Sequence, residues 1–305
     1  PNSYSFDHCG LLTWTVEDWA IALGALVGYD HRDPSSTPCQ RRDFSSGLAD
    51  GIRGARIGVL RHWWQVDARA NDELDGAMEE AVRVLHSLGA TVEEVQLRPL
   101  QAYHDVKTVI AESEIFCVHQ HLLQTRPQDF GADFLRRTLA GCLFSASDYV
   151  QAQRQRREII DEFSILFGRY DAVVTAGGGP APKMKDQLRN AFAHKWRNPS
   201  IYNPFSVAGG PALSVCIGFA SNGLPMAMQI AGRAFGEPTV LRVGHAFESA
   251  TNWRARRPQL SAASQASEDL EVPASPVSAG RDAEQATRDF VAAAVKRAGL
   301  ELTDQ

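Results

Sequence analysis

The chain contains few of the side-chain patterns that nucleophilic enzymes use. It has neither a G-x-S-x-G turn, which would expose a serine nucleophile, nor an S-x-x-K pair. Cys9 stands beside His8, but neighbouring side chains of an extended segment point in opposite directions. None of the five lysines lies among glycines and serines: Lys107, Lys183, Lys185, Lys195 and Lys296. We therefore predict no catalytic nucleophile and base within these 305 residues.

A metal site is also not predicted. Glu112, Glu114, His119 and His121 fall in one helical stretch, but a zinc hydrolase helix carries H-E-x-x-H and this stretch does not. The cysteines are odd in number and lack metal-type spacing, which favours reduced thiols. These are Cys9, Cys39, Cys117, Cys142 and Cys216. The sequence thus predicts neither a metal nor a cofactor.

The composition is that of an ordinary globular protein, with 44% apolar and 22% charged residues. A net charge of −5 gives no electrostatic reason to expect nucleic acid or an anionic membrane as a partner. No apolar run approaches the roughly 20 residues of a membrane span, and no signal-peptide pattern opens the chain. We expect a cytoplasmic protein.

The elements that would position a site alternate between helix and strand. Apolar spacing predicts a helix over 15–27, with Thr15 and Asp18 as a capping box. A strand, helix and parallel strand follow at 56–60, 71–88 and 91–95, with Gly89 closing the helix. No G-x-G-x-x-G joins the first strand to its helix, so a nucleotide site is not favoured.

The second half repeats the alternation around a glycine-rich turn. The strand at 171–175 ends in Gly177, Gly178 and Gly179, at the edge where α/β sheets bind ligands. Two further strands flank Asn222-Gly223, whose pair tolerates positive φ at both residues and predicts a hairpin. The other predicted elements are helices at 103–123, 132–144, 147–170 and 237–251, and the hairpin strands at 212–219 and 226–230.

Three polar stretches could be either sites or surface. The basic run at 153–157 precedes Glu158, Asp161 and Glu162, which favours a solvated helix face over a phosphate site. His245 and Glu248 are spaced as an acid and base pair would be, but a helix-surface contact is favoured. The stretch at 183–197 is either a lid with cations or a surface connection, and we favour the connection.

Three motifs resemble one known family. N-P-F-x-x-A-G-G-P-A-L-S-V begins at Asn203, and G-L-P-M-A-M-Q-I-A-G and F-G-E-P-T-V-L-R-V-G-H-A-F-E follow it. These resemble the C-terminal segment of the amidase signature enzymes, which are serine hydrolases that cleave carboxamides. The opening P-N-S-Y-S-F-D-H-C-G-L-L-T-W-T-V-E-D-W-A resembles the segment after that family's nucleophile loop. The resemblance runs from Pro1 to about residue 260.

The resemblance implies an α/β fold, with a mixed β-sheet core flanked by helices on both faces. It also implies an acyl-enzyme amidase whose serine nucleophile, second serine and lysine base all lie upstream of Pro1. We therefore expect the chain to be an incomplete amidase domain, a fragment that is inactive alone. Two alternatives stay open: a catalytically dead binding or scaffold subunit, and an amidotransferase A-type subunit.

The same resemblance suggests residues near a pocket for a small-molecule amide. The expected substrate-binding residues are Tyr202, Asn203, Phe205, Gly178 and Gly209. The expected structural residues are Asp7, Gly210 and Pro211, with Asp7 accepting local N–H bonds. Relatives also commonly carry a Glu and a His near the pocket, where this chain has Glu114 and His119.

The composition changes after the last strands and helix. We predict an amidase portion over 1–260, a flexible linker over 261–281 rich in Ser, Ala and Pro, and a helical tail over 282–305. The tail helix is too short to fold alone, so it is expected either to dock on another chain, as a homodimer or with a partner subunit, or to begin a module truncated at Gln305.

Overall fold

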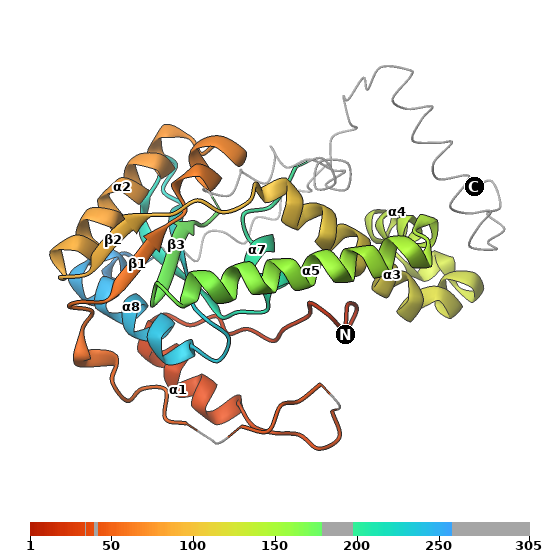
Figure 1. The fold of residues 1–305 in the computed structure, drawn as a ribbon, viewed down its shortest axis with the longest axis horizontal. Helices are drawn as coiled ribbons and strands as arrows, with labels where there is room; N and C mark the ends of the chain where they lie inside the picture. The colour runs from red at the N-terminus through yellow and green to blue at the C-terminus, as the bar shows by residue number, and fades with distance from the viewer. Residues whose placement is uncertain (34, 40–41, 179–197, 258–305) are drawn as a thin grey trace, which may run out of the picture.

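A five-stranded mixed sheet forms the centre of the protein (Figure 1). The computed structural model describes residues 1–33, 35–39, 42–178 and 198–257. The strand order is β2-β1-β3-β5-β4, with β1 parallel to β2 and β3, and β5 antiparallel to β3 and β4. The strands are β1 Arg56–Val59, β2 Thr91–Glu94, β3 Ala172–Ala176, β4 Ala212–Phe219 and β5 Pro225–Ala231. The predicted mixed α/β architecture is confirmed.

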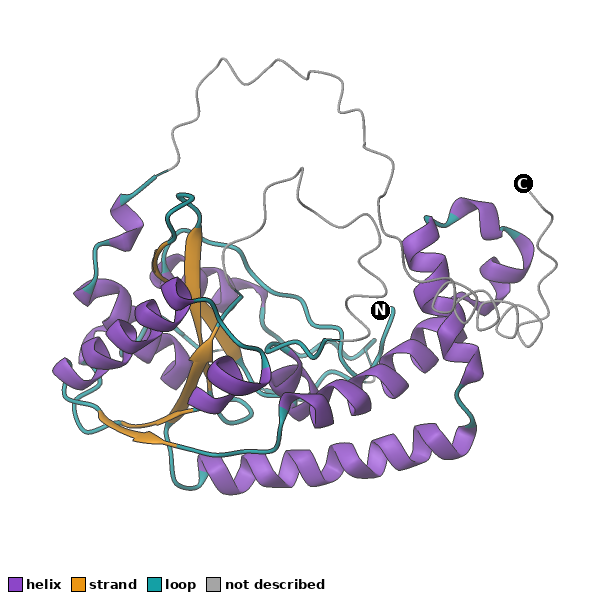
Figure 2. Ribbon diagram, turned by 90° about the horizontal axis from the view of Figure 1, so that it is seen from above, coloured by secondary structure: helices purple, strands orange, loops and turns teal. Residues whose placement is uncertain are grey.

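Helices cover both faces of this sheet near its middle (Figure 2). All five residues of β3 are buried, and successive side chains of a strand point to opposite faces, so both faces must be covered there. The helices are α1 Val16–Leu26, α2 Asp72–Ser87, α3 Leu100–Thr125, α4 Ala132–Ala140, α5 Ala146–Phe167, α7 Asn203–Ala208 and α8 Glu237–Ala250. No helix in the described part of the chain is long and apolar enough to cross a membrane.

Local sequence signals set several helix ends, and those at Thr15 and Gly89 were predicted. The Thr15 side chain accepts the Asp18 N–H and the Asp18 carboxylate accepts the Thr15 N–H, which is the expected capping box of α1. Asn71 caps α2 by accepting the N–H of Leu74 at 3.0 Å. Gly89 follows that helix with φ of 89°, a conformation that glycine adopts without strain.

The hairpin between β4 and β5 is confirmed, and only Gly223 of the Asn222-Gly223 pair adopts positive φ. Gly223 has φ of 83°, whereas Phe235 is the one non-glycine residue with positive φ in the described chain. Asn222 therefore does not adopt the left-handed conformation that a two-residue Asn-Gly turn requires. The loop is instead closed by hydrogen bonds from Gly223 N–H to Ala220 O and from Ala220 N–H to Leu224 O.

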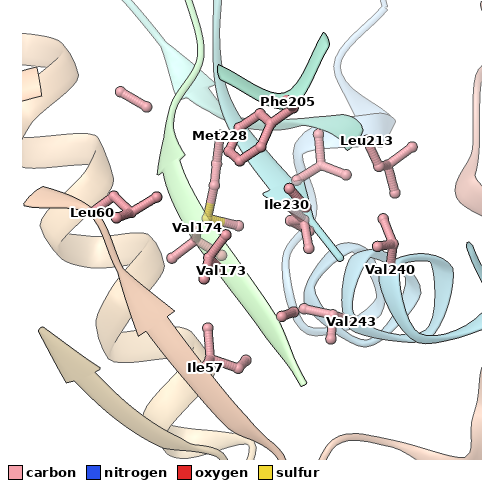
Figure 3. Close-up of a cluster of buried hydrophobic side chains, with 14 of the residues drawn as sticks. Ile57, Leu60, Val173, Val174, Phe205, Leu213, Met228, Ile230, Val240 and Val243 are labelled. Carbon is pink, nitrogen blue, oxygen red and sulfur yellow. The ribbon is translucent and has the colours of Figure 1, made fainter. Parts of the chain in front are cut away.

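One continuous core unites the sheet with its helices (Figure 3). Within it, four aromatic rings come from four separate elements, with ring centroids 5.5 to 6.1 Å apart: Trp63, Tyr103, Phe163 and Phe205. Aromatic pairs at such separations stabilise beyond the area they bury. This packing ties α3, α5 and α7 to the segment that follows β1.

Three predicted segments lie outside the described residues. They are the connection at 183–197, the linker at 261–281 and the helical tail at 282–305. The division of the chain into an amidase portion, a linker and a tail therefore stays a prediction.

Candidate functional site

A cavity of about 320 Å³ lies at the carboxyl end of β3. Ligands of open α/β sheets bind at this end of the strands. The wall is made of small and apolar side chains together with the backbone of two glycines, and Arg69 is the one charged residue among the described residues that line it. The lining residues are Trp64, Ala68, Arg69, Ala70, Asn71, Leu74, Ala176, Gly177, Gly178 and Ile201.

The two glycines in this wall are closely approached, one by a backbone carbonyl and the other by a side-chain hydroxyl. A Cβ on Gly177 would lie 2.8 Å from the carbonyl oxygen of Ala227, to which the Gly177 N–H donates. A Cβ on Gly178 would lie 2.7 Å from Oη of Tyr202, and this hydroxyl oxygen accepts the Gly178 N–H. The predicted residues Gly178 and Tyr202 therefore meet at the edge of the cavity.

Gln229 joins the two backbone segments that line the cavity. Its buried Nε2 donates to Ala176 O at 3.0 Å and to Ile201 O at 3.2 Å. Sequence reasoning missed this residue. The available signal was one amide side chain inside the otherwise apolar strand P-M-A-M-Q-I-A, because a buried amide needs specific partners.

The structure places the other predicted pocket residues away from the cavity wall. Asn203 Nδ2 lies 3.3 Å from Nδ1 of His104, on α3. Phe205 is 3% exposed and packs in the aromatic core. Gly209 ends α7 with φ of 75°. None of these three lines the cavity at β3.

The three predicted structural residues make local contacts. Oδ2 of Asp7 accepts the N–H groups of Asn2 at 2.6 Å and Ser3 at 3.1 Å. Gly210 approaches the backbone so closely that a Cβ there would lie 2.8 Å from the carbonyl oxygen of Gly232. The carbonyl of Pro211 accepts the Gly232 N–H at 3.1 Å.

A carboxylate on α3 accepts hydrogen bonds from the first residues of the chain. Oε2 of Glu114 accepts from Ser3 Oγ at 2.6 Å and from Ser5 N at 2.9 Å, while Oε1 accepts from Ser5 Oγ and from Tyr149 Oη. Burial by itself would raise the pKa of this carboxyl, but the hydrogen bonds from Ser3, Ser5 and Tyr149 outweigh burial and hold the pKa below its ordinary value.

His119 is a second contact between α3 and the same segment. Its Nε2 lies 2.7 Å from Oδ1 of Asn2, and its ring packs edge-on against Phe130 and Phe134. In the described ranges no group of three or more His, Cys, Asp and Glu side chains could hold a metal ion. Glu114 and His119 thus bind protein groups.

Glu112, two residues before Glu114, points into the protein. It is 1% exposed and lies 3.4 Å from Nε of Arg137 and 3.7 Å from Nζ of Lys107. Burial raises the pKa of its carboxyl, and the two cations offset this only in part. This buried charge group links α3 to α4.

The basic run predicted to be solvent-facing contains one exception. Nε of Arg156 donates to Val207 O at 3.0 Å, and Nη2 donates to Ser5 O at 3.1 Å. The prediction of a fully solvated face is therefore wrong at this residue. His245 and Glu248 do not pair with each other: His245 Nδ1 lies 3.0 Å from Leu48 O, and Glu248 accepts the N–H of Val16.

The sequence matches the protein-family model described as Amidase over residues 1–241. An amidase of Pseudomonas putida is 32% identical over 268 residues, which span 85% of this chain and 56% of that protein. The A subunit of the glutamyl-tRNA(Gln) amidotransferase of Chloroflexus aggregans is 31% identical over 282 residues, spanning 85% of this chain and 57% of that one. The chain thus spans a little over half the length of these curated relatives.

Solved structures of related proteins also resemble this chain. A protein described in a study of a vestigial protein complex and the origins of an s-triazine catabolic enzyme superimposes with a TM-score of 0.71 at 28% identity, covering 82% of this chain and 55% of that one. The A subunit of the glutamyl-tRNA(Gln) amidotransferase of Thermotoga maritima superimposes with a TM-score of 0.65 at 29% identity, covering 81% and 53%.

Proposed function

Because the chain belongs to the amidase family, we propose that the protein hydrolyses the C–N bond of a carboxamide. The products are a carboxylate and ammonia or an amine. A serine oxygen attacks the amide carbon and the amine leaves with a proton; water then cleaves the acyl ester and restores the serine. The match to the family model over residues 1–241 is the observation that carries this proposal.

The residues of this chain supply the sheet and part of the pocket wall, and the serine nucleophile and its lysine base lie outside the 305 residues. The contacts of the two serines nearest the start of the chain support this division. Ser3 and Ser5 donate their hydroxyl protons to Glu114. A carboxylate whose pKa lies below its ordinary value is a poor general base, so this contact does not activate either hydroxyl.

The cavity at β3 is the proposed place of substrate contact. Its volume of about 320 Å³ falls at the small end of the range for small-molecule sites, which are concave and mostly apolar with few polar groups. Tyr202, Asn203, Phe205, Gly178 and Gly209 remain the proposed substrate-binding residues. Asn203, Phe205 and Gly209 do not line the cavity, so for these three the contact is indirect, through the position they give to α7.

A second candidate function is an amidotransferase A-type subunit. Its support is the identity of 31% to the A subunit of the Chloroflexus aggregans amidotransferase, in a group of similar relatives that carry the same name. A protein of this kind works with partner chains, as does a catalytically dead scaffold. A homodimer or a partner subunit bound through 282–305 is proposed with either function.

The test is ammonia release from aliphatic and aromatic amides, measured for the 305-residue chain and for the protein encoded by the complete gene. We expect release by the complete protein and none above a buffer blank by the 305-residue chain. Release by the shorter chain that disappears in Cys9→Ala would replace the serine mechanism with a thiol mechanism. Glutamine hydrolysis that requires a co-purified partner would favour the amidotransferase, and no hydrolysis at all would favour the scaffold.

A further inference from the structure

The guanidinium group of Arg156 bridges two segments that are far apart in the sequence. It donates from Nε to Val207 O at 3.0 Å and from Nη2 to Ser5 O at 3.1 Å, and it lies 4.8 Å from the centre of the Phe6 ring. A guanidinium is planar and presents its donors in a fixed fork. Two carbonyl groups bound to one such fork are therefore held at a fixed separation.

One of these carbonyls belongs to the end of a helix. Val207 lies in the last turn of α7, where helix carbonyls lack intrahelical partners. A cation is favoured at this end because of the helix dipole. The same helix begins at Asn203, directly after Ile201 and Tyr202 beside the cavity. A shift of α7 would therefore move Tyr202 relative to Gly178.

The other carbonyl belongs to the segment 2–7, which runs beside α5 (Figure 1). This segment is also held by Glu114, through the hydroxyls of Ser3 and Ser5 and one backbone N–H, and by His119 through Asn2. Tyr149, about two helical turns before Arg156 on α5, donates to the same Glu114. The segment thus contacts both α3 and α5, and Arg156 connects it to α7.

We infer that Arg156 is a positioning residue, which fixes the separation between the segment 2–7 and α7, the helix that follows Ile201 at the cavity wall. This inference rests on the proposed function, in which the segment 2–7 continues from the residues that carry the nucleophile. The Arg156 guanidinium then aligns the reacting side of the site with its binding side without touching the substrate. Misplacement of about 1 Å in such an alignment is enough to lower kcat by about a hundredfold.

The test compares Arg156→Ala and Arg156→Lys with Arg154→Ala. Arg154 is exposed on the same helix, so its variant removes the same charge without removing either carbonyl contact. In the complete protein we expect Arg156→Ala to lower kcat by about tenfold to a hundredfold with a smaller change in KM, and added ethylguanidinium to restore part of kcat. Lysine cannot span both carbonyls, so the kcat of Arg156→Lys should lie between those of Arg156→Ala and the unmodified protein. Arg154→Ala should behave as the unmodified protein does.

Deuterium exchange of the 305-residue chain gives a readout that does not need activity. Arg156→Ala should speed exchange both in residues 2–7 and in α7, and Arg154→Ala should not. Unchanged exchange in Arg156→Ala, or an unchanged kcat in a folded Arg156→Ala enzyme, would overturn the inference. Absence of amide hydrolysis by the unmodified complete protein would instead reject the proposed function, and exchange would still decide whether Arg156 holds the two segments together.

Discussion

Replacing Gly141 with alanine should open the contact between α3 and the short helix Gly141–Leu143. The backbone at Gly141 is helical, with φ of −60° and ψ of −28°, so alanine would be favoured there by about 1 kcal/mol on helix propensity alone. The atoms around Gly141 predict the opposite effect, a loss of stability. A Cβ at this position would overlap the carbonyl oxygen of Glu112, and it would lie 2.7 Å from that carbonyl carbon and 2.8 Å from Cβ of Phe116.

The expected loss is large because the obstructing atoms belong to a helix backbone. Overpacking a well-packed contact costs about 1–3 kcal/mol. Moving α3 away would also stretch the 3.4 Å contact between Arg137 and the Glu112 carboxylate; breaking a fully buried ion pair costs about 3–5 kcal/mol, and this pair costs less because the Arg137 side chain is 32% exposed. A partial loss of both contacts gives about 3 kcal/mol. At about 2–4 °C per kcal/mol, the melting temperature should fall by about 6–12 °C.

Thermal unfolding followed by circular dichroism measures this effect in the 305-residue chain. Gly76→Ala is the matched control, because Gly76 lies inside α2 and an added Cβ there would have no atom within 4 Å. That variant should keep or raise the melting temperature, because its free energy of unfolding should rise by up to about 1 kcal/mol. A fall of less than about 2 °C in Gly141→Ala, or equal falls in both variants, would refute the reasoning.

Three further predictions follow from the described contacts. The pKa of Glu114 in the folded protein lies below its ordinary value, so its hydrogen bonds stabilise the fold above the ordinary pKa and are lost as pH falls through the folded pKa. Acidification should therefore reduce the protection of the Ser5 N–H against exchange. Glu114→Gln should abolish this pH-dependent loss of protection. Tyr202→Phe removes the acceptor of the Gly178 N–H and should cost about 1 kcal/mol in the free energy of unfolding, measured by urea titration. A thiol reagent should label the exposed Cys9, Cys39 and Cys117 first in the native protein and the half-buried Cys216 more slowly, while the buried Cys142 should react only after unfolding.

Local patterns predicted the elements of the fold well. Thr15 with Asp18, Asn71 and Gly89 each act within a few residues of their own position, so the sequence near them contains the whole interaction. The hairpin was predicted for the same reason. Within its turn, Asn222 tolerates positive φ but does not require it, and the loop bonds of Ala220 and Gly223 favour another geometry.

The candidate site was harder to predict because its contacts join distant parts of the chain. Arg156 was expected to face solvent from the charges beside it on α5, yet its partners are 51 and 151 residues away. Gln229 similarly bonds to residues 53 and 28 positions away. The motif resemblance suggested that Tyr202 and Gly178 both lie near the pocket. The residues around Phe205 do not indicate whether its ring lines the pocket or packs in the core.

The bridge through Arg156 also sets an order of events during synthesis. Ser5 leaves the ribosome 151 residues before Arg156 does. At about 5–20 residues per second, this is a delay of roughly 8 to 30 seconds. For most of that interval neither Glu114 nor Arg156 has been synthesised, so the segment 2–7 cannot bind either of them. Val207 is synthesised later still. Apart from the bonds of Asn2 and Ser3 to Asp7, residues 2–7 are therefore among the last to find their native partners, and the nascent segment is open to chaperones and proteases until α7 has been made.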